Sequence, residues 1–150
     1  MLADLVHNRI ESELKAASKR EALQELAGAA CAGTPGLKRD QVYQALQERE
    51  GLGSTGIGEG IAIPHGKLKE LDRIIICFGR SRAGVPFDAV DGKPVHLFFV
   101  LLAPESAARE YLHTLAQLSR FLKNPSVRAR LLQAGTVQEL SAIFREAAWD

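Results

Sequence analysis

The sequence predicts a single α/β domain with a mixed central β-sheet flanked by helices on both faces. Segments with the patterns of strands and of helices alternate along the chain, which is typical of a sheet with helices packed against it. The run Val95–Ala103 is continuously apolar, as expected for a strand covered on both of its faces. The chain has 150 residues, of which 46% are hydrophobic and 25% charged, and this suits one compact domain with a sizeable core.

Residue spacing and capping residues define the predicted elements in chain order. Apolar residues at helical spacing predict helices over Lys19–Ala32, Arg39–Glu50, 105–123, 126–134 and 137–148. Ser18 and Thr136 are expected to cap the first and last of these helices. Runs of β-branched and aromatic residues predict strands over 9–14, 61–63, 73–81 and Val95–Ala103, with a connecting segment at 84–90 that can add a short strand.

The composition argues against several classes of function. Nineteen basic and 18 acidic residues give a formal charge of +1, so no charge pattern indicates binding to nucleic acid or to an anionic membrane. No apolar run approaches the roughly 20 residues needed to span a bilayer, and the N-terminus lacks a signal-peptide pattern, so we expect a cytoplasmic protein without membrane insertion. Cys31 and Cys77 are expected to be reduced core residues. The spacings CxxC, HxH and HExxH are absent, so we expect no metal site.

The most distinctive stretch is glycine-dense from Gly53 and ends at Pro64-His65-Gly66. The pattern predicts that a short strand ends at Pro64, which has no N–H to donate to a sheet. Gly66 is expected to leave space beside the imidazole of His65. A histidine placed in this way suits nucleophilic or proton-transfer chemistry, although a lone histidine is more often a structural or surface residue.

Two familiar phosphate-binding patterns do not fit this stretch. Residues 51–56 match G-x-G-x-x-G, but that dinucleotide-binding pattern requires a preceding strand and a following helix. Here the preceding segment is helical and the following one is rich in glycine, so we reject the match. No Gly-Lys-Ser/Thr follows the glycines, and a P-loop is therefore absent.

Arg49 and His113 are the candidate residues that could act together with His65. Arg49 lies in the last turn of a predicted helix, where it either balances the helix dipole or supplies a guanidinium to an anion near His65. His113 lies away from the predicted apolar stripe of its helix, so it is either solvated or part of a site next to the most buried strand. That stripe consists of Tyr111, Leu115, Leu118 and Leu122. His7, in the N-terminal tail, and His96, at a strand start, are weaker candidates.

The segment L-G-S-T-G-I-G-E-G-I-A-I-P-H-G-K-L (residues 52–68) resembles the phosphorylation-site motif of fructose/mannitol-type enzyme IIA domains of the bacterial phosphotransferase system. The similarity is greatest to the nitrogen-regulatory members and continues through 49–50, 86–89, 91–95 and 112–115. It implies one enzyme IIA type-2 domain over residues 1–150, with a mixed sheet flanked by helices. The N-terminus departs most from the family pattern.

The resemblance implies a phosphotransferase component, a histidine phosphoryl carrier without a cofactor. His65 would be the phosphoryl acceptor, through Nε2, and Arg49 and His113 fall on the family's two supporting positions. The donor would be a histidine phosphocarrier protein (HPr-like). The phosphorylation state would regulate proteins involved in nitrogen or potassium control, such as potassium transport or sensor-kinase components. Two alternatives remain open: a sugar-specific enzyme IIA that passes phosphate to a IIB domain, and a binding domain with a vestigial site.

Overall fold

A computed structural model describes residues 2–147 and contains a six-stranded mixed sheet, as predicted. The strands are β1 (Ile10–Glu11), β2 (Gly56–Gly58), β3 (Ile61–Ala62), β4 (His65–Lys67), β5 (Ile75–Val85) and β6 (Val95–Ala103). They lie in the order β1-β5-β6-β3-β2, and β4 also pairs with β6. β6 runs antiparallel to β5 and parallel to β3 and β4, so the most apolar strand lies at the centre of the sheet.

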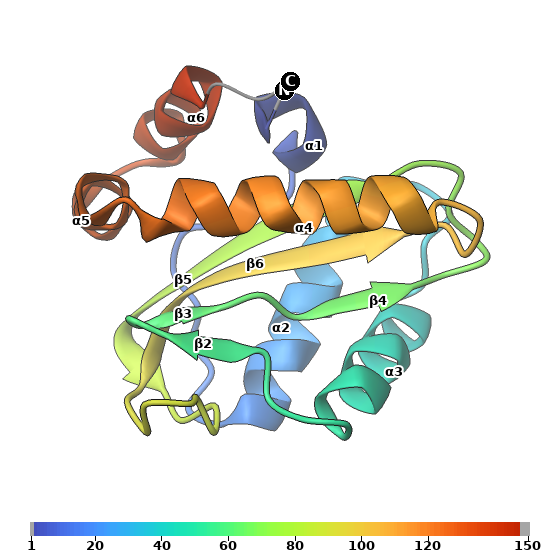
Figure 1. Cartoon of the computed structure of the whole chain (residues 1–150), viewed down its shortest axis with the longest axis horizontal. Helices are drawn as coiled ribbons and strands as arrows, with labels where there is room; N and C mark the ends of the chain where they lie inside the picture. The colour runs from blue at the N-terminus through green and yellow to red at the C-terminus, as the bar shows by residue number, and fades with distance from the viewer. Residues whose placement is uncertain (1, 148–150) are drawn as a thin grey trace.

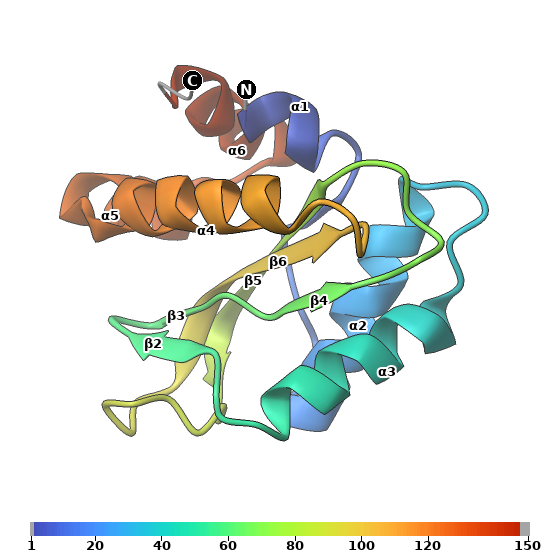
Figure 2. The ribbon, with the colours of Figure 1, turned by 45° about the vertical axis from the view of Figure 1, so that its right-hand side comes forward.

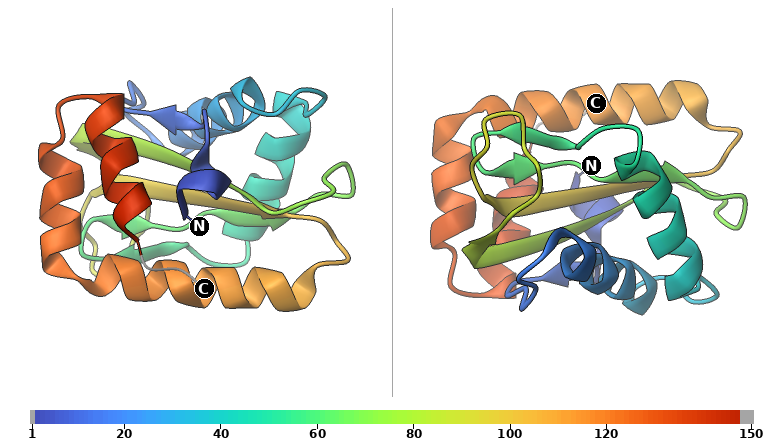
Figure 3. Two further views of the ribbon diagram at one scale, coloured as in Figure 1. Left: turned by 90° about the horizontal axis from the view of Figure 1, so that it is seen from above. Right: turned by 90° about the horizontal axis from the view of Figure 1, so that it is seen from below.

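Helices cover both faces of this sheet, as Figures 1 and 3 show. On one face lie α2 (Lys19–Ala32) and α3 (Arg39–Glu50). On the other lie α1 (Leu2–Val6), α4 (Ala108–Lys123), α5 (Pro125–Gln133) and α6 (Val137–Glu146). Successive β6 side chains enter opposite cores: Phe98 packs with the first group of helices and Phe99 with the second. β6 is therefore continuously apolar because helices cover both of its faces, as the sequence predicts.

Capping side chains set several helix boundaries. Ser18 Oγ accepts a hydrogen bond from the Glu21 N–H, and Thr136 Oγ1 accepts one from the Glu139 N–H, so both predicted caps are confirmed. α4 begins at Ala108 rather than at residue 105, because a turn closed by the Ala107 N–H and the Pro104 carbonyl precedes it. α5 is shifted by one residue from its predicted bounds. The predicted end of the last helix, Ala148, lies outside the described residues.

The N-terminal prediction was wrong in part. The strand expected over 9–14 is only Ile10–Glu11, and α1 precedes it, so His7 follows a helix rather than lying in a tail. The buried Arg9 side chain explains this arrangement, because its guanidinium donates to the carbonyls of Ile76, Gly33 and Leu5. These contacts join the end of α1 to β5 and to the turn after α2. They depend on residues distant in sequence and leave no local pattern.

The strand before His65 is interrupted at 63–64, as predicted, but pairing with β6 resumes at His65, which the sequence did not indicate. Ile61 pairs with Leu97 and His65 pairs with Leu101, four residues further along both strands, so β3 and β4 follow β6 in one register. Pro64 lacks an N–H, but its carbonyl accepts a hydrogen bond from Leu101 N at 2.9 Å. His65 therefore begins a renewed strand instead of terminating one. The strand predicted over 73–81 is likewise displaced, since β5 runs from Ile75 to Val85.

Candidate active site

The candidate site lies where β4 passes between α3 and the N-terminal end of α4 (Figure 2). β4 carries His65, and the last turn of α3 carries Arg49. The glycine-rich segment 53–60 connects α3 to β3. The structure thus brings together two of the three residues proposed from the sequence, which are 16 positions apart in the chain.

Both ring nitrogens of His65 have defined hydrogen-bond partners. Nδ1 lies 2.7 Å from the Ile63 carbonyl oxygen, and Arg49 Nε lies 3.0 Å from Nε2. A carbonyl oxygen only accepts hydrogen bonds and a guanidinium only donates them. Nδ1 therefore carries the proton, and Nε2 presents its lone pair toward Arg49.

Arg49 is held at a second point. Its Nη1 donates to the Gly53 carbonyl at 2.9 Å, while its Nε donates to His65. Two directed contacts from one planar guanidinium define its orientation more closely than a general attraction to the helix dipole would. The geometry therefore favours the functional interpretation of Arg49 over the purely structural one.

The surroundings of His65 favour its neutral form. Burial lowers the pKa of His65 below its ordinary value of 6.5, and the hydrogen bond to the Ile63 carbonyl partly opposes this by raising it. The charge of Arg49 lowers the pKa further, and the charge of Glu50 raises it. The ring of Tyr111 packs against the imidazole, with the two ring centroids 5.7 Å apart. Lys67 Nζ lies over the same Tyr111 ring, 5.4 Å from its centroid. The imidazole is thus half-buried and oriented, and its surroundings favour the neutral form.

Gly66 has a packing role that the sequence did not indicate. A Cβ at this position would lie 3.2 Å from the Ala45 Cβ on α3, so the glycine allows close packing of α3 on β4. That packing brings Arg49 to His65. Gly56 acts similarly in the glycine-rich segment, because a Cβ there would lie 2.9 Å from the Ala89 Cα. The glycines therefore bring segments of this chain together around the site.

The His113 side chain makes no hydrogen bond or ring contact with His65 or Arg49. It is exposed on α4, two residues after Tyr111, and among residues 2–147 it has no side-chain hydrogen bond. Of the apolar stripe predicted for this helix, Tyr111, Leu118 and Leu122 are buried and Leu115 is half-buried. The polar residues Thr114 and Gln117 are buried as well.

Sequence reasoning missed Tyr111 and Glu50 as parts of the site. Tyr111 was assigned only to the core, although it also touches His65. Glu50 is buried and accepts hydrogen bonds from Thr55 in the glycine-rich segment. Its position at i+8 from Val42 and i+4 from Leu46 places it on the apolar stripe of α3, which is the signal that could have identified it.

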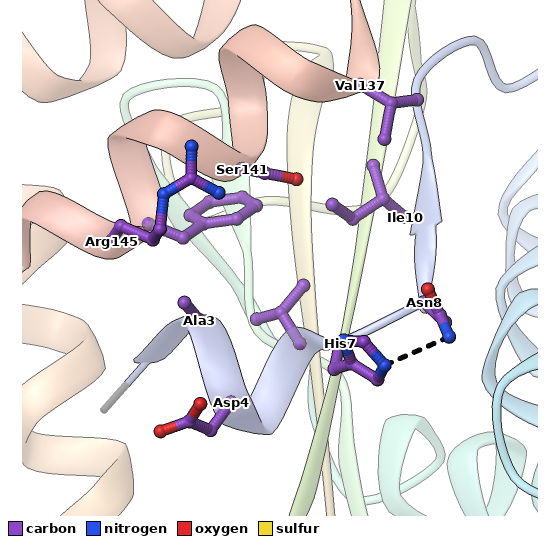
Figure 4. Close-up of a pocket in the computed structure, with 10 residues that line it drawn as sticks. Ala3, Asp4, His7, Asn8, Ile10, Val137, Ser141 and Arg145 are labelled. Carbon is purple, nitrogen blue, oxygen red and sulfur yellow. Dashed lines mark hydrogen bonds between the residues drawn. The ribbon is translucent and has the colours of Figure 1, made fainter.

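Other features lie away from this site. A hollow of about 500 Å³ lies between α1, β1 and α6. Its lining residues include His7, Ser141 and Arg145, which Figure 4 labels. β1 pairs with β5 whereas β4, which carries His65, pairs with β6, so two central strands lie between β1 at the hollow and His65. In residues 2–147 neither cysteine is paired, no cluster of three potential metal ligands occurs, and no helix is long and apolar enough to cross a bilayer. Burial raises the pKa of the Cys77 thiol to about 12.

Comparisons with known proteins identify the family. Residues 5–147 match the family described as the phosphoenolpyruvate-dependent sugar phosphotransferase system, EIIA 2. The chain is 41% identical over 131 residues to the nitrogen regulatory protein of Bradyrhizobium diazoefficiens, covering 87% of this chain and 85% of that protein. It is 41% identical over 108 residues to a fructose-specific EIIA component of Haloferax volcanii, covering 72% and 70% of the two chains.

A solved structure agrees with both the fold and the resemblance noted from the sequence. The nitrogen regulatory protein IIA-Ntr from Neisseria meningitidis superimposes with a TM-score of 0.88 at 35% identity, covering 95% of this chain and 97% of that one. This chain therefore belongs to the EIIA 2 family of the phosphoenolpyruvate-dependent sugar phosphotransferase system.

Proposed function

We propose that this chain is a phosphoryl carrier, acting as one EIIA type-2 domain over residues 1–150. It accepts a phosphoryl group on Nε2 of His65 from a phosphorylated histidine phosphocarrier protein. The observation that carries this proposal is the pair of hydrogen bonds on the imidazole, at 2.7 Å to Ile63 and 3.0 Å to Arg49. They leave Nε2 as the unprotonated nitrogen and place a cation beside it.

The transfer exchanges one P–N bond for another. The Nε2 lone pair attacks phosphorus, the P–N bond of the donor breaks, and its electron pair returns to the donor's imidazole. His65 keeps its Nδ1 proton throughout, so its ring becomes cationic while the donor leaves as a neutral imidazole. The Ile63 carbonyl, 2.7 Å from Nδ1, stabilises that positive charge by accepting the N–H hydrogen bond.

Arg49 has two successive tasks in this scheme. In the resting site its Nε donates to the lone pair of Nε2, which must be free for attack on phosphorus. The incoming phosphoryl group offers anionic oxygens at the same place, and these are stronger acceptors for a guanidinium than a neutral nitrogen is. The guanidinium then moves from Nε2 to the phosphoryl oxygens, while the Gly53 carbonyl anchors its other end.

His113 supports the transfer from the rim of the site. Its exposure leaves the ring free to approach an incoming phosphoryl group after the donor docks. Charge stabilisation and positioning are the main requirements of phosphoryl transfer, so a second donor beside Arg49 fits this chemistry. His65, Arg49 and His113 thus form the proposed catalytic set.

We favour a regulatory role for the phosphorylated protein, acting on partners of the potassium-transport or sensor-kinase kind. The similarity to two nitrogen regulatory proteins supports this choice. Phosphorylation adds about −1.5 to −2 charges, so a partner docked over His65 would meet a new anion. The similarity to a fructose-specific EIIA component keeps the second candidate, a sugar-specific enzyme IIA that passes phosphate to a IIB domain.

Mass spectrometry after incubation with phosphorylated histidine phosphocarrier protein tests the carrier function. We expect one acid-labile phosphate on His65 and none in His65→Ala. His7→Ala is a matched control, because His7 is exposed at the distant hollow. Full phosphate incorporation into His65→Ala would overturn the assignment, and no incorporation into the wild type would favour a vestigial site.

A second experiment separates the two roles of the carrier. Phosphorylated protein is mixed with fructose- and mannitol-type IIB domains, and both phosphorylation states are used in pull-downs with candidate regulated proteins. We expect a partner that distinguishes the two states. Rapid stoichiometric transfer to a sugar IIB domain, with no such partner, would instead support the transport role.

A further inference from the structure

We infer that Glu50 is a positioning residue, whose buried carboxylate holds the segment 53–55 and thereby keeps Arg49 directed at His65. This inference rests on the proposed phosphoryl transfer at His65 and adds a residue to it. Glu50 and Arg49 are neighbours in the last turn of α3. One carboxylate faces the interior while the adjacent guanidinium reaches the imidazole.

The Glu50 carboxylate is almost fully enclosed, with 5% of its side chain exposed. Its Oε1 accepts a hydrogen bond from the Thr55 backbone N–H at 3.1 Å, and its Oε2 accepts one from the Thr55 hydroxyl. Lys19 Nζ lies 3.0 Å from Oε1. A carboxylate this deeply buried requires such partners, and removal of any one of them leaves charge without compensation.

Further contacts of Ser54 and Lys19 hold the glycine-rich segment against neighbouring parts of the fold. Ser54 Oγ donates to the Phe87 carbonyl at 2.7 Å, and Lys19 lies over the Phe87 ring, 4.8 Å from its centroid. Lys19 Nζ also lies 3.7 Å from a carboxylate oxygen of Asp88. The segment is thereby tied to α2, to α3 and to the connection that follows β5.

The consequence for the site lies at Gly53. Its carbonyl accepts a hydrogen bond from Arg49 Nη1 at 2.9 Å, two residues before the Thr55 contacts with Glu50. A φ of 148° at Gly53 is accessible mainly to glycine, so the local backbone does not hold this carbonyl by side-chain sterics. Gly53 is held instead by hydrogen bonds on both sides: its own N–H donates to the Glu50 carbonyl at 3.1 Å, and Thr55, two residues later, is bound by the Glu50 carboxylate. Glu50 therefore acts on the guanidinium through Thr55 and Gly53.

Two substitutions test this chain of contacts without removing a group that touches the phosphoryl. Glu50→Gln keeps the side-chain volume but removes the charge paired with Lys19. Thr55→Val keeps the shape of Thr55 but deletes the hydroxyl donor to Glu50, and Thr55→Ser restores that donor as the matched conservative variant. Thermal unfolding of each variant identifies a temperature at which all of them are folded, and the measurements are made there. If Glu50→Gln does not fold, Thr55→Val alone tests the inference.

The first measurement is the NMR signal of the Arg49 Nε–H in unphosphorylated protein. We expect a protected signal in the wild type and in Thr55→Ser, because this proton is hydrogen-bonded to His65. We expect its protection to be lost in Glu50→Gln and Thr55→Val. Retained protection in both folded variants would overturn the inference. This measurement needs no phosphoryl transfer, so its result is independent of whether the proposed function is correct.

The second measurement is the rate of phosphate acceptance at saturating donor, in a double-mutant cycle with Arg49→Ala. A misplacement of about 1 Å caused by a substitution away from the reacting atoms can cost on the order of 100-fold in rate, and we expect a loss of about 10- to 100-fold in Glu50→Gln and Thr55→Val. In the Arg49→Ala background the same substitutions should change the rate less than about twofold, because their effect passes through Arg49. Equal effects in both backgrounds would show a merely structural role and overturn the inference.

Discussion

Replacement of Arg49 by alanine tests the geometry of the site most directly. The guanidinium lies 3.0 Å from Nε2, the atom that forms the new P–N bond. Removal of one preorganised donor from a transition state typically costs about 2.7–4 kcal/mol. The resting hydrogen bond to Nε2 is also lost in the variant, and a typical net hydrogen bond contributes about 1 kcal/mol to the ground state. The two effects oppose each other, so the net barrier should rise by about 2–3 kcal/mol, or about 30- to 150-fold in rate.

Quenched-flow transfer of labelled phosphate from the phosphorylated donor measures this rate. Arg49→Lys should recover only part of it, because an ammonium keeps the charge but cannot bind His65 and the Gly53 carbonyl as a planar fork. Arg145→Ala is the matched control, since Arg145 is exposed near the distant hollow. The pKa of His65 should rise slightly in Arg49→Ala, because the charge of Arg49 lowers it while burial, the larger cause, remains. A rate within threefold of wild type, measured where His65 is neutral, would refute the proposed role of Arg49.

Four further predictions follow from the site and its packing. His113→Ala should slow transfer on the order of tenfold or more without lowering the melting temperature, because the side chain is exposed; an unchanged rate would indicate a solvated histidine. An NMR titration of the folded protein should give a His65 pKa below 6.5. Because burial in the folded state lowers this pKa, the contribution of neutral His65 to the free energy of unfolding should be complete above pH 6.5 and should be lost as the pH falls through the folded-state pKa. Gly56→Ala should destabilise the fold by about 1–3 kcal/mol in urea unfolding, since its Cβ would lie 2.9 Å from the Ala89 Cα, whereas Gly135→Ala should be near neutral. Transfer from donor that is already phosphorylated should proceed fully with chelator present, and its loss would contradict metal-free transfer.

Local patterns in the sequence determined the main elements of the fold. Ser18 and Thr136 predicted their helix starts because a cap involves residues only three positions apart. The apolar run of β6 predicted a strand covered on both faces, and the packing of Phe98 and Phe99 in different cores confirmed it. The α1 helix was missed because it is only five residues long and is held by packing and by the distant contacts of Arg9.

The sequence also indicated candidate residues of the site, through the long motif that ends after His65 and through the position of Arg49 at the end of its helix. The tertiary structure alone placed Arg49 Nε against Nε2 and so assigned the proton of His65 to Nδ1, because that contact joins α3 to β4 across the Gly66–Ala45 packing. It likewise showed that pairing with β6 resumes directly after Pro64. Register is set by pairing with β6, a partner more than 30 residues away in the chain. The burial of Glu50 has the same origin: a carboxylate at a helix end is ordinarily solvated, and only the approach of Lys19 and Thr55 from other segments allows it to be enclosed.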